Sequence, residues 1–169
     1  IESGLDFTEG GALYNMSGFQ AFGIATCADS LCAIRRLVYE SHELTLPELV
    51  EILRANWDGH EELRAKVRTD TPHYGNDNDE ADALAVRMVR ELELEVGRYR
   101  NVRGGRFILG LWSFWAHVST GKVLAASADG RGHGESLSHS MDPMMGRGLA
   151  GPTAAIRSGS KIDTSELAN

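Results

Sequence analysis

The segment FILGLWSFWAHV at residues 107–118 constrains the fold most strongly, because aromatic and branched side chains are concentrated there. We expect a long strand, in which successive side chains point to opposite faces of a sheet. One face is apolar or small: Ile108, Gly110, Trp112, Phe114, Ala116 and Val118. The other face is mixed: Leu111, Ser113, Trp115 and His117. A mixed face favours a ligand pocket, in which a few polar groups lie among aromatic rings, and a solvent-facing edge strand is the alternative.

Helical patterns surround this strand on both sides. The predicted helices are 23–41, Thr45 to Trp57, 60–69, Asn78 or Asp79 to Tyr99, and Pro152 to Gly159. Thr45 and Glu48 form a capping-box pattern at the start of the second helix. Short extended segments are expected at 12–16 and 123–126. The order of helices and strands predicts an α/β architecture.

Composition excludes several classes of function. The formal net charge of −7 argues against a broad nucleic-acid-binding surface, since such surfaces are basic. No apolar run reaches the roughly 18 residues of a membrane helix, and no secretory leader pattern is present. Cys27 and Cys32 lie on different faces of one predicted helix, which excludes a disulfide between them. Free thiols suit a reducing compartment, so we expect a cytoplasmic protein with neither nucleic-acid nor membrane partners.

The glycine-rich segment 127–151, SADGRGHGESLSHSMDPMMGRGLAG, raises three chemical possibilities. Gly146, Gly148 and Gly151 match a dinucleotide-binding pattern, but Pro143 disfavours the strand that must precede it. Metal-ligating residue types also gather here, namely Asp129, His133, Glu135 and His139, and His117 lies on the predicted strand before the segment. Their spacing matches no known metal motif, and the serines of this segment lie in no GxSxG elbow. We therefore expect no bound metal and no serine nucleophile.

Six blocks resemble, in order, the C-terminal half of glycyl radical enzymes, a family that includes pyruvate formate-lyase and several dehydratases and lyases. The blocks are DFTEGGALYN (6–15), GIATCADSLCAIRRLVYE (23–40), YGNDNDEADALA (74–85), RGGRF (103–107), DGRGHGESL (129–137) and GPTAAIRSGSKID (151–163). The dehydratase and lyase branches are more similar than pyruvate formate-lyase itself. Leu13 departs from the family's usual Arg, and Ser127 and Ala128 replace its usual Leu-Pro.

The resemblance implies part of a ten-stranded α/β barrel that encloses a small-molecule substrate. In this family a glycyl radical passes to a cysteine, and the cysteine thiyl abstracts a substrate hydrogen. A partner activating enzyme, which uses S-adenosylmethionine and an iron–sulfur cluster, installs the glycyl radical. The full-length enzyme is expected to be a homodimer. Residues 1–169 would be a partial barrel domain that lacks both the thiyl Cys loop and the radical Gly domain, and hence an inactive piece with no catalytic residue of its own.

The resemblance also places the strand before the DGR turn inside the barrel. Ser113, Trp115 and His117 are therefore the predicted substrate-binding residues, with Trp115 as a wall and the other two as hydrogen-bonding groups. Trp112 and Phe114 are the alternative if the opposite strand face lines the pocket. Arg131 of the DGR turn is expected to anchor its loop. A non-catalytic α/β scaffold is the alternative function for the chain.

Overall fold

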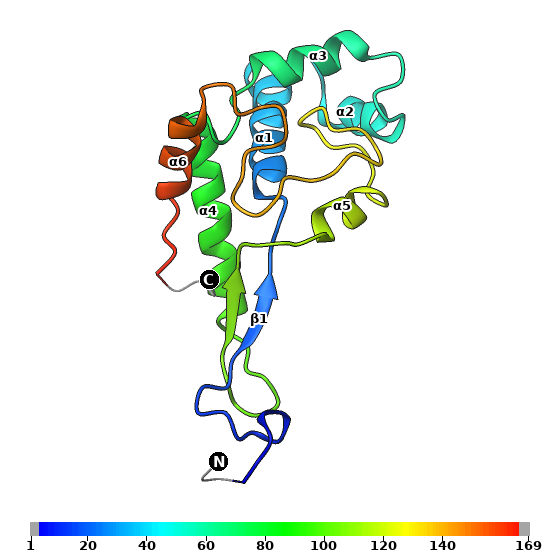
Figure 1. Cartoon of the computed structure of the whole chain (residues 1–169). Helices are drawn as coiled ribbons and strands as arrows, with labels where there is room; N and C mark the ends of the chain where they lie inside the picture. Colours follow the sequence, from blue (N-terminus) through cyan, green and yellow to red (C-terminus); the bar gives the residue numbers. More distant parts are fainter. Residues whose placement is uncertain (1–3, 166–169) are drawn as a thin grey trace.

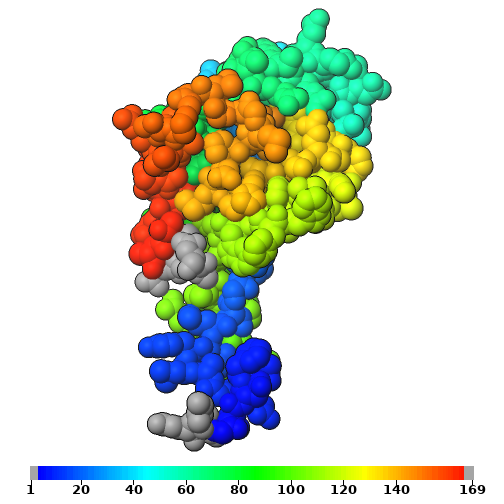
Figure 2. All heavy atoms as spheres, in the orientation of Figure 1, coloured from blue at the N-terminus to red at the C-terminus, as the bar shows by residue number. Residues whose placement is uncertain are grey.

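The computed structural model describes residues 4–165. Its elements are, in order, η1 (Phe7–Glu9), β1 (Ser17–Gln20), α1 (Ile24–Ile34), η2 (Arg35–Glu40), α2 (Leu46–Arg54), α3 (Glu61–Asp70), α4 (Asp79–Val96), β2 (Phe107–Gly110), α5 (Ala116–Gly121) and α6 (Pro152–Ser160). A narrow N-terminal part projects from a larger, mainly helical body (Figures 1 and 2). The chain is therefore an α/β protein, as the order of patterns predicts.

The two strands form a parallel pair, with Ser17 opposite Phe107 and Gln20 opposite Gly110. Each strand leads upward into the helical body, where α1 and α4 lie side by side (Figure 1). The core between these elements contains small side chains of α1 and α4 together with Leu109 of β2 and Leu111 just after it. Small residues such as Ala28 and Ala85, both fully buried, allow the two helices to pack closely.

A second core lies at the far end of α1, where α2 and α3 pack against η2. It is centred on Trp57, which is 1% exposed, and on Leu37, Leu49 and Val67. The predicted capping box is confirmed: the Thr45 hydroxyl accepts the Glu48 N–H, and the Glu48 carboxylate accepts the Thr45 N–H. The helix ends at Arg54 rather than at Trp57, because the backbone turns left-handed at Asn56 and Trp57.

The long connection from α5 to α6 packs over α1 and α3. Ser138 and Thr26 bond reciprocally, since the Ser138 N–H donates to Thr26 Oγ1 (2.8 Å) and the Thr26 N–H donates to Ser138 Oγ (3.2 Å). This exchange satisfies an N–H at the start of α1 that has no partner within the helix. The connection is thereby fixed to the first turn of α1.

The predicted helices at 23–41, 60–69, 79–99 and 152–159 are confirmed within a few residues at their ends. The long strand over 107–118 is wrong beyond Gly110, and the short strand over 123–126 is absent from the described chain. The N-terminal strand lies at 17–20 rather than at 12–16. A strand continues only where its backbone finds a partner, and β1 turns into α1 at Gly23, directly after pairing with Gly110.

None of the helices between residues 4 and 165 combines the length and the apolar character that crossing a bilayer requires.

Candidate functional site

The carboxyl ends of β1 and β2 meet at one place in the fold, and the residues of interest lie just beyond them. β2 leads to Ser113 and then to α5, while β1 leads to the first turn of α1. Ligands of parallel sheets bind most often beyond the carboxyl ends of the strands, where loops supply side chains. The backbone therefore brings the predicted substrate-binding residues to a favoured position, although not on a strand.

Ser113 and His117 lie against each other at the start of α5. Ser113 is 2% exposed, and its Oγ lies 2.8 Å from His117 Nδ1. Ser113 lies in the irregular segment before α5 and His117 in the first turn of α5, so their contact does not arise from the strand alternation by which they were selected. Trp115, between them, is 65% exposed. The structure thus brings together two of the three predicted residues and leaves the third at the surface.

The alternative pair behaves differently. The rings of Trp112 and Phe114 pack edge to face with centroids 4.9 Å apart. Phe114 is 85% exposed and Trp112 is 36% exposed. Because no strand continues here, the division into odd and even faces does not apply to either set.

Three residues of the glycine-rich segment join Ser113 and His117. The His139 ring packs edge to face against His117, with centroids 4.8 Å apart. His139 Nδ1 lies 2.9 Å from Asp142 Oδ2. Ser140 Oγ accepts the Ser113 N–H at 3.2 Å and lies 3.4 Å from His139 Nε2. We define Ser113, His117, His139, Ser140 and Asp142 as the Ser–His cluster.

Arg131 anchors the connection that carries this cluster, as expected. The guanidinium is 1% exposed and donates to the backbone oxygens of Ala125, Gly132 and Glu135 and to Ser127 Oγ. Burial lowers the pKa of Arg131, and the negative charges of Asp129 and Glu135 oppose that shift. A single buried side chain therefore satisfies several backbone acceptors of a segment that has no regular secondary structure.

A buried group of charges binds the same connection to α1. Arg147 Nη1 lies 3.1 Å from Asp129 Oδ2 and 3.9 Å from Asp29 Oδ2, and all three side chains are almost completely buried. His73 Nδ1 lies 3.1 Å from Asp29 Oδ2, and the Tyr74 N–H donates to Asp29 Oδ1. Burial raises the pKa of Asp29, and these partners oppose the rise.

The other candidate ligands of the glycine-rich segment lie apart from one another. Glu135 pairs with Arg64 at 2.6 Å, and His133 Nδ1 lies 3.0 Å from the Leu124 oxygen. Across residues 4–165, no three His, Cys, Asp or Glu side chains are arranged to hold a metal ion. The segment before Gly146 forms turns, so the strand of a dinucleotide-binding unit does not precede the glycines.

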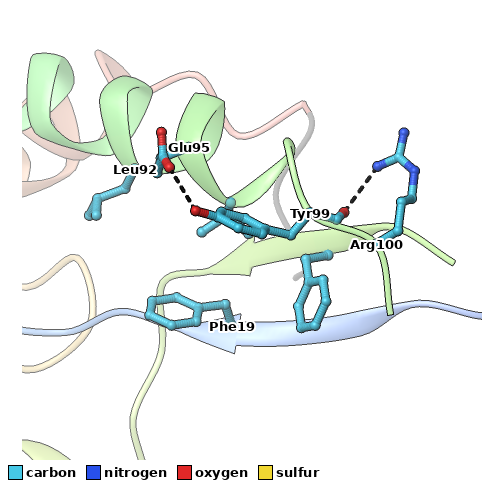
Figure 3. A pocket seen from close by; sticks show the side chains of 7 residues that line it. Phe19, Leu92, Glu95, Tyr99 and Arg100 are labelled. Carbon is cyan, nitrogen blue, oxygen red and sulfur yellow. Dashed lines mark hydrogen bonds between the residues drawn. The ribbon is translucent and has the colours of Figure 1, made fainter. Parts of the chain in front are cut away.

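An apolar groove of about 360 Å³ lies elsewhere, between the end of α4 and the two strands (Figure 3). Phe19, Leu92, Val96 and Phe107 provide most of its lining, together with Tyr99. Its polar groups already have partners, since the Tyr99 hydroxyl donates to Glu95 at 3.1 Å, and Arg100 donates to the Tyr99 oxygen (Figure 3). The groove therefore offers apolar surface rather than the converging polar groups that orient a small substrate.

Comparison with known proteins identifies the family. Residues 1–121 match the family model described as pyruvate formate lyase-like. The chain belongs to this family. Its relatives lie in the dehydratase and lyase branch of the glycyl radical enzymes.

This pyruvate formate lyase-like chain is 41% identical over 172 residues to a (2S)-3-sulfopropanediol dehydratase of Klebsiella oxytoca. The aligned region covers 99% of the chain and 21% of that dehydratase. Hydroxyproline dehydratase from Clostridioides difficile, with trans-4-hydroxy-L-proline bound, superposes with a TM-score of 0.93 and is 34% identical. This match covers 98% of the chain and 21% of the hydroxyproline dehydratase. The glycerol-bound, B12-independent glycerol dehydratase from Clostridium butyricum superposes with a TM-score of 0.89 and is 38% identical. This match covers 96% of the chain and 20% of the glycerol dehydratase.

The pyruvate formate lyase-like chain thus spans about a fifth of the length of these relatives. Its α/β arrangement is that of one part of a glycyl radical enzyme. The contacts between His139 and His117 were not predicted, because they join segments 22 residues apart whose approach depends on the fold of the connection. The only sequence signal was the concentration of His and Ser residues at 136–140.

Proposed function

We propose that this chain is part of a glycyl radical dehydratase or lyase, and that it supplies one wall of the site for a small hydroxylated substrate. The observation that carries the proposal is the Ser113–His117 pair, joined at 2.8 Å beyond the carboxyl ends of two parallel strands. Two relatives are described with glycerol and with hydroxyproline bound, and each of these molecules has a hydroxyl group. A hydroxyl and an imidazole are suitable groups to bind such a substrate or its leaving oxygen.

In this proposal Ser113 and His117 bind and orient, and Trp115 forms a wall against the substrate. The glycyl radical supplies hydrogen abstraction through a cysteine. Ser113 Oγ fixes the orientation of the His117 ring, so that the other ring nitrogen, Nε2, is available to a substrate oxygen. A ring held in this way loses little further freedom when substrate binds, which lowers the entropic cost of binding.

Neither cysteine of the chain suits the thiyl role in this proposal. Cys32 is fully buried in α1, and burial, with the nearby charges of Glu80 and Asp29, raises the pKa of its thiol to about 12. Cys27 is accessible on another face of the same helix, where partial desolvation by the surrounding chain, with the charge of Asp129, raises the pKa of its thiol. We therefore assign the thiyl Cys and the radical Gly to other parts of the full-length enzyme. The binding of the partner activating enzyme and the homodimer contact are likewise proposed for the full-length enzyme.

The test uses the full-length gene product, activated under anaerobic conditions with S-adenosylmethionine and an activating enzyme. Electron paramagnetic resonance should show a glycyl radical, and the activated enzyme should consume a hydroxylated compound from a panel of glycerol, 1,2-propanediol, (2S)-3-sulfopropanediol and trans-4-hydroxy-L-proline. His117→Ala should retain the radical and lose most of the turnover. A stable protein with no radical after activation would favour the non-catalytic scaffold.

A further inference from the structure

The Ser–His cluster contains a chain of hydrogen bonds whose direction is fixed from one end. An ionised carboxylate can only accept hydrogen bonds, so Asp142 Oδ2, 2.9 Å from His139 Nδ1, places the proton of that ring on Nδ1. His139 Nε2 is then an acceptor. Ser140 Oγ lies 3.4 Å from that nitrogen and is the hydroxyl that can donate to it.

The same hydroxyl leads directly to the substrate-binding pair. Ser140 Oγ accepts the Ser113 N–H at 3.2 Å, so it holds the backbone of the residue whose own Oγ contacts His117. The His139 ring packs edge to face against His117 at 4.8 Å. His117 is therefore held from two directions, by Ser113 at one ring nitrogen and by the His139 ring against its side.

Backbone strain marks the centre of this arrangement. Ser140 has a φ of 45°, in the left-handed region that residues other than glycine rarely occupy. Such a conformation is unfavourable and persists only where surrounding contacts enforce it, which happens most often at functional sites. Here it allows Ser140 Oγ to reach both the Ser113 N–H and the His139 ring.

We infer that Asp142, His139 and Ser140 form a clamp that positions the His117 ring for the substrate, an inference that rests on the proposed role of Ser113 and His117. Asp142 and His139 are positioning residues, because they act through His117. Their side chains are 67% and 44% exposed, so the contact between them adds little to stability. Changes to the clamp can therefore be separated from changes in folding.

The first test needs no substrate. In the full-length enzyme, exchange of the imidazole Cε1 hydrogen with deuterium reports the environment of each histidine and is read by mass spectrometry. Asp142→Asn offers an amide N–H in place of a carboxylate oxygen and should change the exchange rate at His117 severalfold, whereas Asp142→Glu retains an anionic acceptor and should change it less. Asp163→Asn is the matched control, because Asp163 is also exposed and bonds locally, to the Ser165 N–H.

The second test measures kcat/KM with the panel compound that the unaltered enzyme consumes. Asp142→Asn should lower it about tenfold or more, since a small misplacement of an orienting group is costly. In a His117→Ala background the same change should have a much smaller further effect, because the clamp acts mainly through that ring and otherwise through the Ser113 N–H that Ser140 Oγ accepts. Radical content, measured by electron paramagnetic resonance, should stay constant in all variants.

The two tests separate the possible failures. An unchanged exchange rate at His117 in Asp142→Asn, or full additivity of the two substitutions, would overturn the clamp. Full turnover by His117→Ala would overturn the proposed substrate role, and the exchange measurement would still show whether the clamp reaches the ring.

Discussion

Arg147→Met removes the only cation that lies between two fully buried carboxylates among the described residues, Asp29 and Asp129. Asp29 keeps two other partners, the His73 ring and the Tyr74 N–H, so the loss falls mainly on Asp129 Oδ2. Breaking a buried ion pair from one side costs about 3–5 kcal/mol, and the remaining partners of Asp29 place this case at about 3 kcal/mol.

The loss should appear as local opening of the connection over α1. Hydrogen–deuterium exchange of peptides from 127–151 in the full-length enzyme measures this opening directly. A loss of about 3 kcal/mol corresponds to exchange about a hundredfold faster, because each 1.4 kcal/mol is a factor of about ten. Arg54→Met is the control, since Arg54 is 72% exposed and its pair with Glu51 lies on the surface of α2.

The double variant Arg147→Met with Asp129→Asn should recover part of the protection, because it removes the unpaired charge as well. Unchanged exchange over 127–151 in Arg147→Met would refute the view that these charges hold the connection on α1.

The remaining predictions concern burial and close packing. Cys32 should resist alkylation in the folded protein and react after unfolding, because burial raises the pKa of its thiol to about 12; a mass increase after iodoacetamide treatment measures this. Burial also raises the pKa of Tyr74 to about 12. The contribution of its neutral hydroxyl to the free energy of unfolding is therefore complete below about pH 10 and is lost as the pH rises through about 12. Tyrosinate absorbance should show Tyr74 still protonated near pH 11. Gly121→Ala should destabilise the protein by about 1–3 kcal/mol, because the new Cβ would overlap the Glu135 oxygen and lie 2.8 Å from Ser136 Cα; thermal unfolding measures this.

The expectations for Gly121 and Tyr74 each have a matched comparison. Gly18→Ala, the comparison for Gly121→Ala, adds a Cβ with no neighbour within 4 Å and should leave the midpoint of thermal unfolding nearly unchanged. Tyr74→Phe should remove the loss of stability above pH 10. Alkylation of Cys32 in the folded state, or equal effects of the two glycine substitutions, would show that the packing around α1 or α5 is looser than described.

The helices were predictable because their signals are local. The apolar stripe of α4, the Asn78 cap and the capping box of α2 each depend on residues within one or two turns. The strand at 107–118 was overestimated because its length depends on a neighbour: pairing with β1 ends at Gly110, and the aromatic residues that follow lie in an irregular segment that bends into α5.

The candidate site was predictable only in part, for the same physical reason. Ser113 and His117 were selected by strand alternation, yet they meet because the irregular segment after β2 bends into the first turn of α5. His139 and Asp142 reach them through a connection without regular secondary structure, whose path is set by buried charges at Arg131 and Arg147. Sequence spacing contains no measure of such a path.

We propose that Ser113 and His117 bind the substrate of a glycyl radical enzyme. A crystal structure of the full-length enzyme with its turned-over compound bound would test this role. A substrate oxygen should lie within hydrogen-bond distance, about 2.7–3.2 Å, of Ser113 Oγ or of a His117 ring nitrogen. A substrate bound away from both side chains, for example in the apolar groove between Phe19 and Phe107, would contradict it.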